Sequence, residues 1–150
     1  GLAFGSAGVH IPHAMSYSVA TLRHEFVAGG YEEREPMVPH GIAVVINAPA
    51  AFRFTAAANP ARHLEAAAAL GADVAAAAPE DAGEILARTF IALMRATGLP
   101  SGIAALGYGE ADVAALAAGA YAQQRPLVMA PRSVSIDDLK GLYRDALRYW

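Results

Sequence analysis

Most of the chain carries apolar residues at the spacing of amphipathic helices. After Pro79-Glu80-Asp81, whose acidic residues suit the positive end of a helix dipole, one apolar stripe runs until Gly98 and Pro100. Its members are Ile85, Leu86, Thr89, Phe90, Leu93 and Met94. A second stripe follows Ser135 and Asp138, whose spacing resembles a capping box. Its members are Ile136, Leu139, Leu142, Tyr143, Ala146, Leu147 and Trp150. These two segments predict the clearest helices.

Three further segments are predicted as helices from their proline, glycine and alanine positions. Residues 7–26 are predicted as a helix that kinks or starts at Pro12. Residues 60–70 form a short helix closed by Gly71. Residues 110–121 form an alanine-rich helix with Val113 and Leu116 facing inward. Between the first and the next helix, residues 29–36 are glycine-rich and then polar, which predicts a loop.

The stretch Ile42–Ile46 is apolar on all sides, so periodicity alone fits a buried strand as well as a buried helix. Pro39 before it suits a first helical turn, and the alanine-rich residues 48–58 continue it. We therefore expect a helix that kinks or ends at Pro49.

These patterns predict an all-α, compact bundle of about six helices in one domain, residues 1–150. Hydrophobic residues make up 55% of the chain and charged residues only 17%. Alanine dominates, in runs such as Ala66–Ala69 and Ala75–Ala78, and alanine has the highest helix propensity and little tendency to form sheets. The bias supports the helical assignment.

The net charge of −3 is spread without a block of like charge, which gives no indication of a nucleic acid or membrane partner. The chain has no cysteine, so a metal would need His, Asp or Glu ligands. We expect no apolar run of membrane-spanning length and no signal sequence, hence a cytoplasmic protein. The chain starts at Gly1, without a methionine and in an apolar segment, which suits a piece that packs against something absent.

Five histidines are the candidates for chemistry: His10, His13, His24, His40 and His63. A neutral imidazole is a common ligand of transition metals. A helix fixes the direction of His13, and Gly41 after His40 leaves room for a ligand, so the two can converge on one ion. Two ligands are too few for a tight site. The alternative is that both are structural. We expect His24 and His63 at the surface, and Tyr17 suits a core position as well as a catalytic one.

Two segments resemble the iron-containing (group III) alcohol dehydrogenases. Residues 3–8, Ala-Phe-Gly-Ser-Ala-Gly, followed by His13-Ala14-Met15, are similar to the family signature, and Val38-Pro39-His40-Gly41 is similar to the next landmark. The resemblance implies that His13 and His40 bind a metal, Fe(II) or Zn(II). It also implies a dehydroquinate synthase-like fold, in which a preceding α/β domain binds NAD(P) and an upstream helix supplies one Asp and one His ligand; this chain lacks both.

The likeness extends over essentially the whole chain and is greatest to the hydroxyacid-oxoacid transhydrogenase branch. Shared segments are Phe52–Thr55, Arg62–Glu65, Leu70–Asp73, Asp81–Gly83, Ala105–Tyr108, Ala130–Arg132 and Asp138-Leu139. Phe4 matches a position that lines the substrate pocket in relatives. Tyr17 stands where many relatives carry a second His, a departure that favours the transhydrogenase branch and makes Tyr17 a candidate catalytic residue.

The resemblance thus predicts the C-terminal part of an oxidoreductase that transfers hydride between a nicotinamide and a small alcohol, hydroxy acid or oxo acid. The isolated chain is expected to be inactive and the whole protein to be a homo-oligomer. Two alternatives stay open. One is a simple NAD(P)-dependent alcohol dehydrogenase, and the other is a non-catalytic helical module for binding or self-association.

Overall fold

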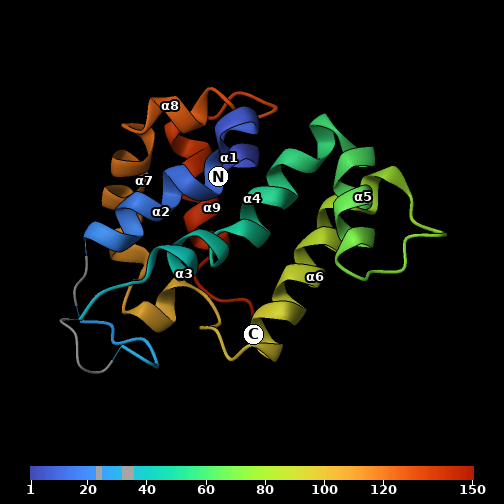
Figure 1. The fold of residues 1–150 in the computed structure, drawn as a ribbon. Helices are drawn as coiled ribbons and strands as arrows, with labels where there is room; N and C mark the ends of the chain where they lie inside the picture. The colour runs from blue at the N-terminus through green and yellow to red at the C-terminus, as the bar shows by residue number, and fades with distance from the viewer. Residues whose placement is uncertain (23–24, 32–35) are drawn as a thin grey trace.

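The computed structural model describes residues 1–22, 25–31 and 36–150 (Figure 1). Within these ranges the chain is helical and contains no strand, so the predicted all-α fold is confirmed. His24 and residues 32–35 of the expected polar loop lie outside the described residues. The described helices are more numerous and shorter than the six expected.

The first half of the chain forms α1 (Leu2–Ala7), α2 (Ile11–Thr21), α3 (His40–Val45), α4 (Ala48–Thr55) and the 3-10 turn η1 (Ala56–Ala58). Pro12 lies in the first turn of α2 and begins that helix. The ambiguous stretch after Pro39 is helical, as expected. The helix ends before Pro49, as expected: Pro49 has no N–H to donate to the Val45 carbonyl four residues earlier, so α3 ends at Val45 and Pro49 lies in the first turn of α4.

The second half forms α5 (Pro60–Ala69), α6 (Ala82–Ala96), α7 (Val113–Tyr121), α8 (Gln124–Leu127) and α9 (Ile136–Asp145). The 3-10 turns η2 (Pro79–Asp81), η3 (Ile103–Leu106) and η4 (Glu110–Asp112) lie between them. Gly71, just beyond α5, has φ 96°, the left-handed conformation expected of a helix-ending glycine. The predicted capping box is present at α9, where the Asp138 amide donates to Ser135 Oγ and the Ser135 amide donates to the Asp138 carboxylate.

Helix α2 crosses the centre of the core, in contact with α3, α7 and α8 (Figure 1). Two buried phenols attach it to distant parts of the chain: Tyr143 of α9 donates to the Met15 carbonyl at 2.9 Å, and Tyr108 donates to the Val19 carbonyl at 2.8 Å. Burial raises the pKa of Tyr143, so its hydroxyl stays protonated and remains a donor. These bonds fix the axial position of α2.

Helix α6 packs between α4 and α5, and this double contact changes which of its residues are buried (Figure 1). Leu86 and Met94 of the predicted stripe are buried, but Leu93 is 42% exposed. The small residues Gly83 and Ala87 are buried instead. The predicted stripe is therefore wrong at Leu93, because the face of α6 that α4 and α5 cover includes the small residues Gly83 and Ala87 and leaves Leu93 outside it. In the second stripe, Leu139, Leu142, Tyr143 and Ala146 are buried, while Ile136 and Trp150 are partly exposed at the ends.

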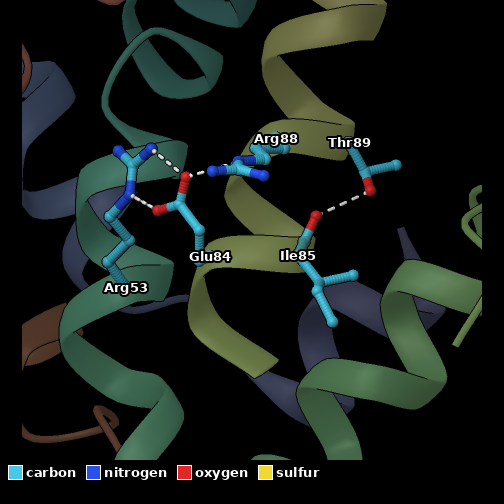
Figure 2. Close-up of polar contacts among 5 residues, drawn as sticks. All are labelled: Arg53, Glu84, Ile85, Arg88 and Thr89. Atoms are coloured by element: carbon cyan, nitrogen blue, oxygen red, sulfur yellow. Dashed lines mark hydrogen bonds and ion pairs between the residues drawn. The ribbon is translucent and has the colours of Figure 1, made fainter. Parts of the chain in front are cut away.

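A polar cluster links α4 to α6 (Figure 2). Arg53 Nε donates to Glu84 Oε2 at 2.6 Å, and Arg88, one turn along α6, donates to Glu84 Oε1 at 2.8 Å. Thr89 Oγ1 donates to the Ile85 carbonyl in the same helix at 2.8 Å. The guanidinium of Arg53 holds the pKa of Glu84 below its ordinary value of 4.5.

The helical stretch His40–Ala58 corrects the expectation that no segment is of membrane-spanning length. The stretch has 19 residues, an 18-residue window within it has a mean hydropathy of 1.4, and it is long and apolar enough to cross a membrane by length and composition. Half of this stretch is buried inside the protein, where α3 and α4 supply Ala43, Ile46, Ala50 and Ala51 to the core. Its composition is thus also that of a core segment.

Candidate metal centre and substrate cavity

The starts of α2 and α3 bring His13 and His40 together. Pro12 stands beside His13 in the first turn of α2, and the His13 amide donates to the His10 carbonyl at 2.9 Å. His40 is the first residue of α3, directly after the extended Pro39. The centroids of the two imidazole rings lie 5.3 Å apart, with the ring planes at 62°. The two imidazoles therefore lie close together, and their binding of one ion stays a prediction.

Both imidazoles line a cavity of about 470 Å³ between α2, α3, α4 and α6. The other lining residues are mostly apolar: Gly8, Val9, His10, Pro12, Gly41, Val44, Val45, Ala48, Phe52 and Phe90. Phe52 and Phe90 stack with centroids 5.3 Å apart. The volume is in the range of small-molecule sites, which are generally apolar with a few convergent polar groups.

Phe4, the predicted substrate-pocket residue, and Tyr17, the candidate catalytic residue, lie beside the two histidines. The rings of Phe4 and His13 have centroids 6.2 Å apart, and those of Tyr17 and His40 have centroids 6.4 Å apart. Phe4 is 58% exposed and Tyr17 is 44% exposed. A core position for Tyr17, the alternative left open above, is thus wrong.

The pKa of His13 is lowered from its ordinary value, first by burial and then by the nearby imidazole of His40. A lowered pKa favours the neutral ring, which is the form that binds metal ions. Within the described residues no group of three or more His, Asp or Glu is close enough to hold a metal ion. In the described part of the chain, His13 and His40 therefore lie together at the cavity with no third ligand close enough to share an ion with them.

His10 is a cavity residue that the sequence reasoning did not assign. Its ring meets Phe52 edge-on with centroids 5.8 Å apart, and its Nδ1 is buried without a hydrogen-bond partner in the described part of the chain. Burial lowers its pKa, and the nearby His63 and His13 lower it further. Its spacing of three residues from His13, one helical turn, was the available signal.

The surface position expected for His63 is wrong. Its side chain is buried, with Nδ1 at 2.8 Å from the Asn59 carbonyl and Nε2 at 2.8 Å from Thr55 Oγ1. A carbonyl only accepts, so Nδ1–H donates to Asn59 and Nε2 accepts from the Thr55 hydroxyl. Both ring nitrogens have hydrogen-bond partners, which is why His63 can be buried although its sequence neighbours are charged.

Known proteins support the resemblance. The sequence profile of the "Fe-containing alcohol dehydrogenase family, C-terminal" matches residues 1–147. The mitochondrial hydroxyacid-oxoacid transhydrogenase of Pongo abelii is 42% identical over 150 residues, which are all of this chain and 32% of that protein. The probable mitochondrial hydroxyacid-oxoacid transhydrogenase of Dictyostelium discoideum is 40% identical over 98% of this chain and 27% of its own length.

Two solved structures share the fold. A 1,3-propanediol oxidoreductase superposes with a TM-score of 0.78 and 25% identity over 97% of this chain and 35% of that one. An alcohol dehydrogenase from Oenococcus oeni superposes with a TM-score of 0.79 and 24% identity over 97% of this chain and 34% of its own.

The curated relatives are mitochondrial proteins by name, which contradicts the expected cytoplasmic location. That expectation rested on the first residues of a chain that spans about a third of its relatives' length, so it carried no information on a targeting segment. The profile match over nearly the whole chain shows that this protein belongs to the Fe-containing alcohol dehydrogenase family, as its C-terminal part.

Proposed function

We propose that this chain is the metal-binding part of an oxidoreductase that transfers hydride between a nicotinamide cofactor and a small hydroxy or oxo acid. The observation that carries the proposal is the convergence of His13 and His40 on one cavity, with Phe4 and Tyr17 beside them. The curated relatives, named hydroxyacid-oxoacid transhydrogenases, support the substrate class.

The two imidazoles fit a shared divalent ion. Two imidazoles that would bind one ion at the usual ~2.1 Å have ring centroids roughly 5 Å apart. The rings of His13 and His40 are 5.3 Å apart. Fe(II) and Zn(II) both accept imidazole ligands. Family resemblance assigns the remaining ligands, one Asp and one His, to the part of the protein that precedes this chain.

When bound, such an ion supplies Lewis-acid polarisation of the substrate oxygen. A nicotinamide cofactor bound in the full-length protein would supply the hydride acceptor and donor: it would take a hydride from a hydroxy acid, whose hydroxyl proton would pass to solvent, and would return that hydride to a second oxo acid, which would take up a proton. Phe52 and Phe90 line the cavity with apolar surface that excludes water, and Phe4 packs against the carbon chain of the substrate. The Tyr17 hydroxyl donates a hydrogen bond to the substrate.

The exposed apolar surface of α1 is consistent with a missing partner domain. All six residues of α1 are described and none is buried; Leu2 is 92% exposed and Phe4 is 58% exposed. We infer that the preceding nucleotide-binding domain covers this face and closes the site, because contiguous apolar patches usually mark interfaces. The isolated chain then lacks cofactor and ligands and is inactive.

Metal analysis of the full-length protein tests the ligand assignment. Replacing His13 and His40 by Ala is expected to remove the bound divalent metal. His63→Gln is the matched control, since His63 does not line the cavity and both of its ring nitrogens have partners elsewhere. It should keep the metal, although its unfolding midpoint falls. Unchanged metal content in the double variant would show that the site assignment is wrong.

Substrate trials separate the proposed reaction from simple alcohol oxidation. Full-length protein is incubated with a hydroxy acid and 2-oxoglutarate, without added NAD(P), and product formation is followed. Turnover under these conditions supports transhydrogenation. Activity that appears only with added free NAD(P) indicates a simple dehydrogenase, and no turnover with any of these substrates indicates a non-catalytic helical module.

A further inference from the structure

A second cavity, of about 400 Å³, lies on the other side of the Gly8-Val9 junction. Gly8 and Val9 line both this cavity and the one that contains the two histidines. Phe4 and Tyr17, which stand beside His13 and His40, also line it. A ligand with its oxygen at the histidine pair can therefore extend past Phe4 and Tyr17 into the second cavity.

Arg125 of α8 is the sole charged residue among those described that line this second cavity. Its side chain has no ion pair or hydrogen bond with any described residue, whereas Arg53, Arg62, Arg88 and Arg144 are each paired with a glutamate. The hydroxyls of Ser6 and Tyr17 also belong to the lining, and the remaining surface is largely apolar. A cation without a counter-ion in such surroundings attracts an anionic group of a ligand.

We infer that Arg125 binds the carboxylate of the substrate and so selects hydroxy and oxo acids over neutral alcohols. The guanidinium offers a planar pair of N–H donors that matches a carboxylate in a bidentate arrangement. The hydroxyl or carbonyl end of the substrate lies at the histidine pair, and the acid end lies at Arg125. This inference rests on the proposed function and adds the residue that determines its substrate class.

Gly8 belongs to the lining that the two cavities share. Its backbone has φ 71° and ψ −171°, a conformation that is essentially restricted to glycine. A Cβ at this position would lie 3.2 Å from Met129 Cε, across the junction. A glycine here leaves space for the carbon chain that connects the two ends of the substrate.

The test compares two substrates of equal length in the full-length enzyme: 4-hydroxybutyrate, which carries a carboxylate, and 1,4-butanediol, which is neutral. The measured quantity is the ratio of kcat/KM for the acid to kcat/KM for the diol. Loss of a charged hydrogen bond in Arg125→Gln is expected to lower this ratio about 10- to 100-fold. The ratio for Arg125→Lys, which keeps the positive charge but not the planar pair of N–H donors, should lie between the ratios for the parent enzyme and for Arg125→Gln. Arg62→Gln, in an exposed pair with Glu65 on α5, is the matched control and should leave the ratio unchanged.

A binding measurement gives an independent readout. Butyrate has no hydroxyl group to oxidise, and it is expected to inhibit the parent enzyme by competing with 4-hydroxybutyrate. It should no longer inhibit Arg125→Gln. The neutral butyramide should inhibit neither the parent enzyme nor the variant. The role of Arg125 would be overturned if Arg125→Gln lowered kcat/KM equally for the acid and the diol, or if butyrate inhibited this variant as strongly as it inhibits the parent enzyme. If the parent enzyme oxidises neither substrate, the proposed function itself fails, and unchanged butyrate binding by Arg125→Gln then also overturns the role of Arg125.

Discussion

The contact between α4 and α6 leaves no room for a side chain at Gly83. A Cβ built at this position lies 2.9 Å from the Cβ of Ala56, 3.1 Å from the Cα of Arg53 and 3.2 Å from the Arg53 carbonyl oxygen. These atoms belong to the backbone or are bonded directly to it, so they cannot rotate away as the tip of a long side chain could. Gly83→Ala therefore forces the helices apart.

Two opposing effects set the size of the change. Replacing a helical glycine by alanine stabilises a helix by up to about 1 kcal/mol, while adding a methyl group to a well-packed contact costs about 1–3 kcal/mol. The net loss for Gly83→Ala is about 1 kcal/mol, or about 2–4 °C in Tm for a protein of this size. Gly141 in α9 is the matched control, because no described atom lies within 4 Å of the point that a Cβ would occupy there. Gly141→Ala should stabilise the protein by about 0.5–1 kcal/mol.

The assay is urea denaturation followed by far-ultraviolet circular dichroism, with the midpoints of the two variants compared with the parent. The reasoning predicts opposite signs: a lower midpoint for Gly83→Ala and a higher one for Gly141→Ala. A midpoint for Gly83→Ala that rises as far as that of Gly141→Ala would show that α4 and α6 are not in close contact.

Two further predictions concern stability at polar positions. The pKa of Glu84 is lowered chiefly by its hydrogen bond from Arg53, so its stabilisation is present above the ordinary value of 4.5 and is lost as the pH falls through the lowered pKa. Because both side chains are partly exposed, Glu84→Gln should cost only about 0.5–1 kcal/mol at neutral pH; urea midpoints that still differ by this amount at low pH would contradict the assignment. Ser135→Ala removes the cap of α9 and should cost about 1 kcal/mol; an unchanged thermal midpoint would show that the cap is not formed.

The fold was predictable where the signal is local. The capping box at Ser135 and the glycine after α5 each satisfy backbone groups within a few residues, so the sequence alone locates both helix ends. The exposure of Leu93 and the burial of His63 were not predictable in this way. The exposure of Leu93 depends on how α6 packs against two other helices. The burial of His63 depends on a hydrogen bond with the hydroxyl of Thr55, which lies in a different helix.

The candidate site, like the fold, was predictable from the sequence only in part. His13 and His40 were selected by family resemblance, and the structure brings their rings together; their role as ligands remains a prediction. Arg125 could not be selected, and His10 could be selected only by its spacing from His13, because what distinguishes both residues is their surroundings. His10 is buried against Phe52 of α4, and Arg125 lines a cavity with residues of α1 and α2.

The two ends of the proposed substrate site are held in different ways. Helices α2 and α3 are fixed by hydrogen bonds from Tyr143 to Met15 and from Tyr149 to the Ile46 carbonyl, so the histidine pair lies on helices anchored in the core. The second cavity is instead lined by the short helices α1 and α8 and the exposed residues after α8. Few packing constraints act on those residues, so changes there disturb the core little. A fold built in this way can keep one arrangement of the histidine pair while different lining residues adapt the proposed site to acids or to neutral alcohols.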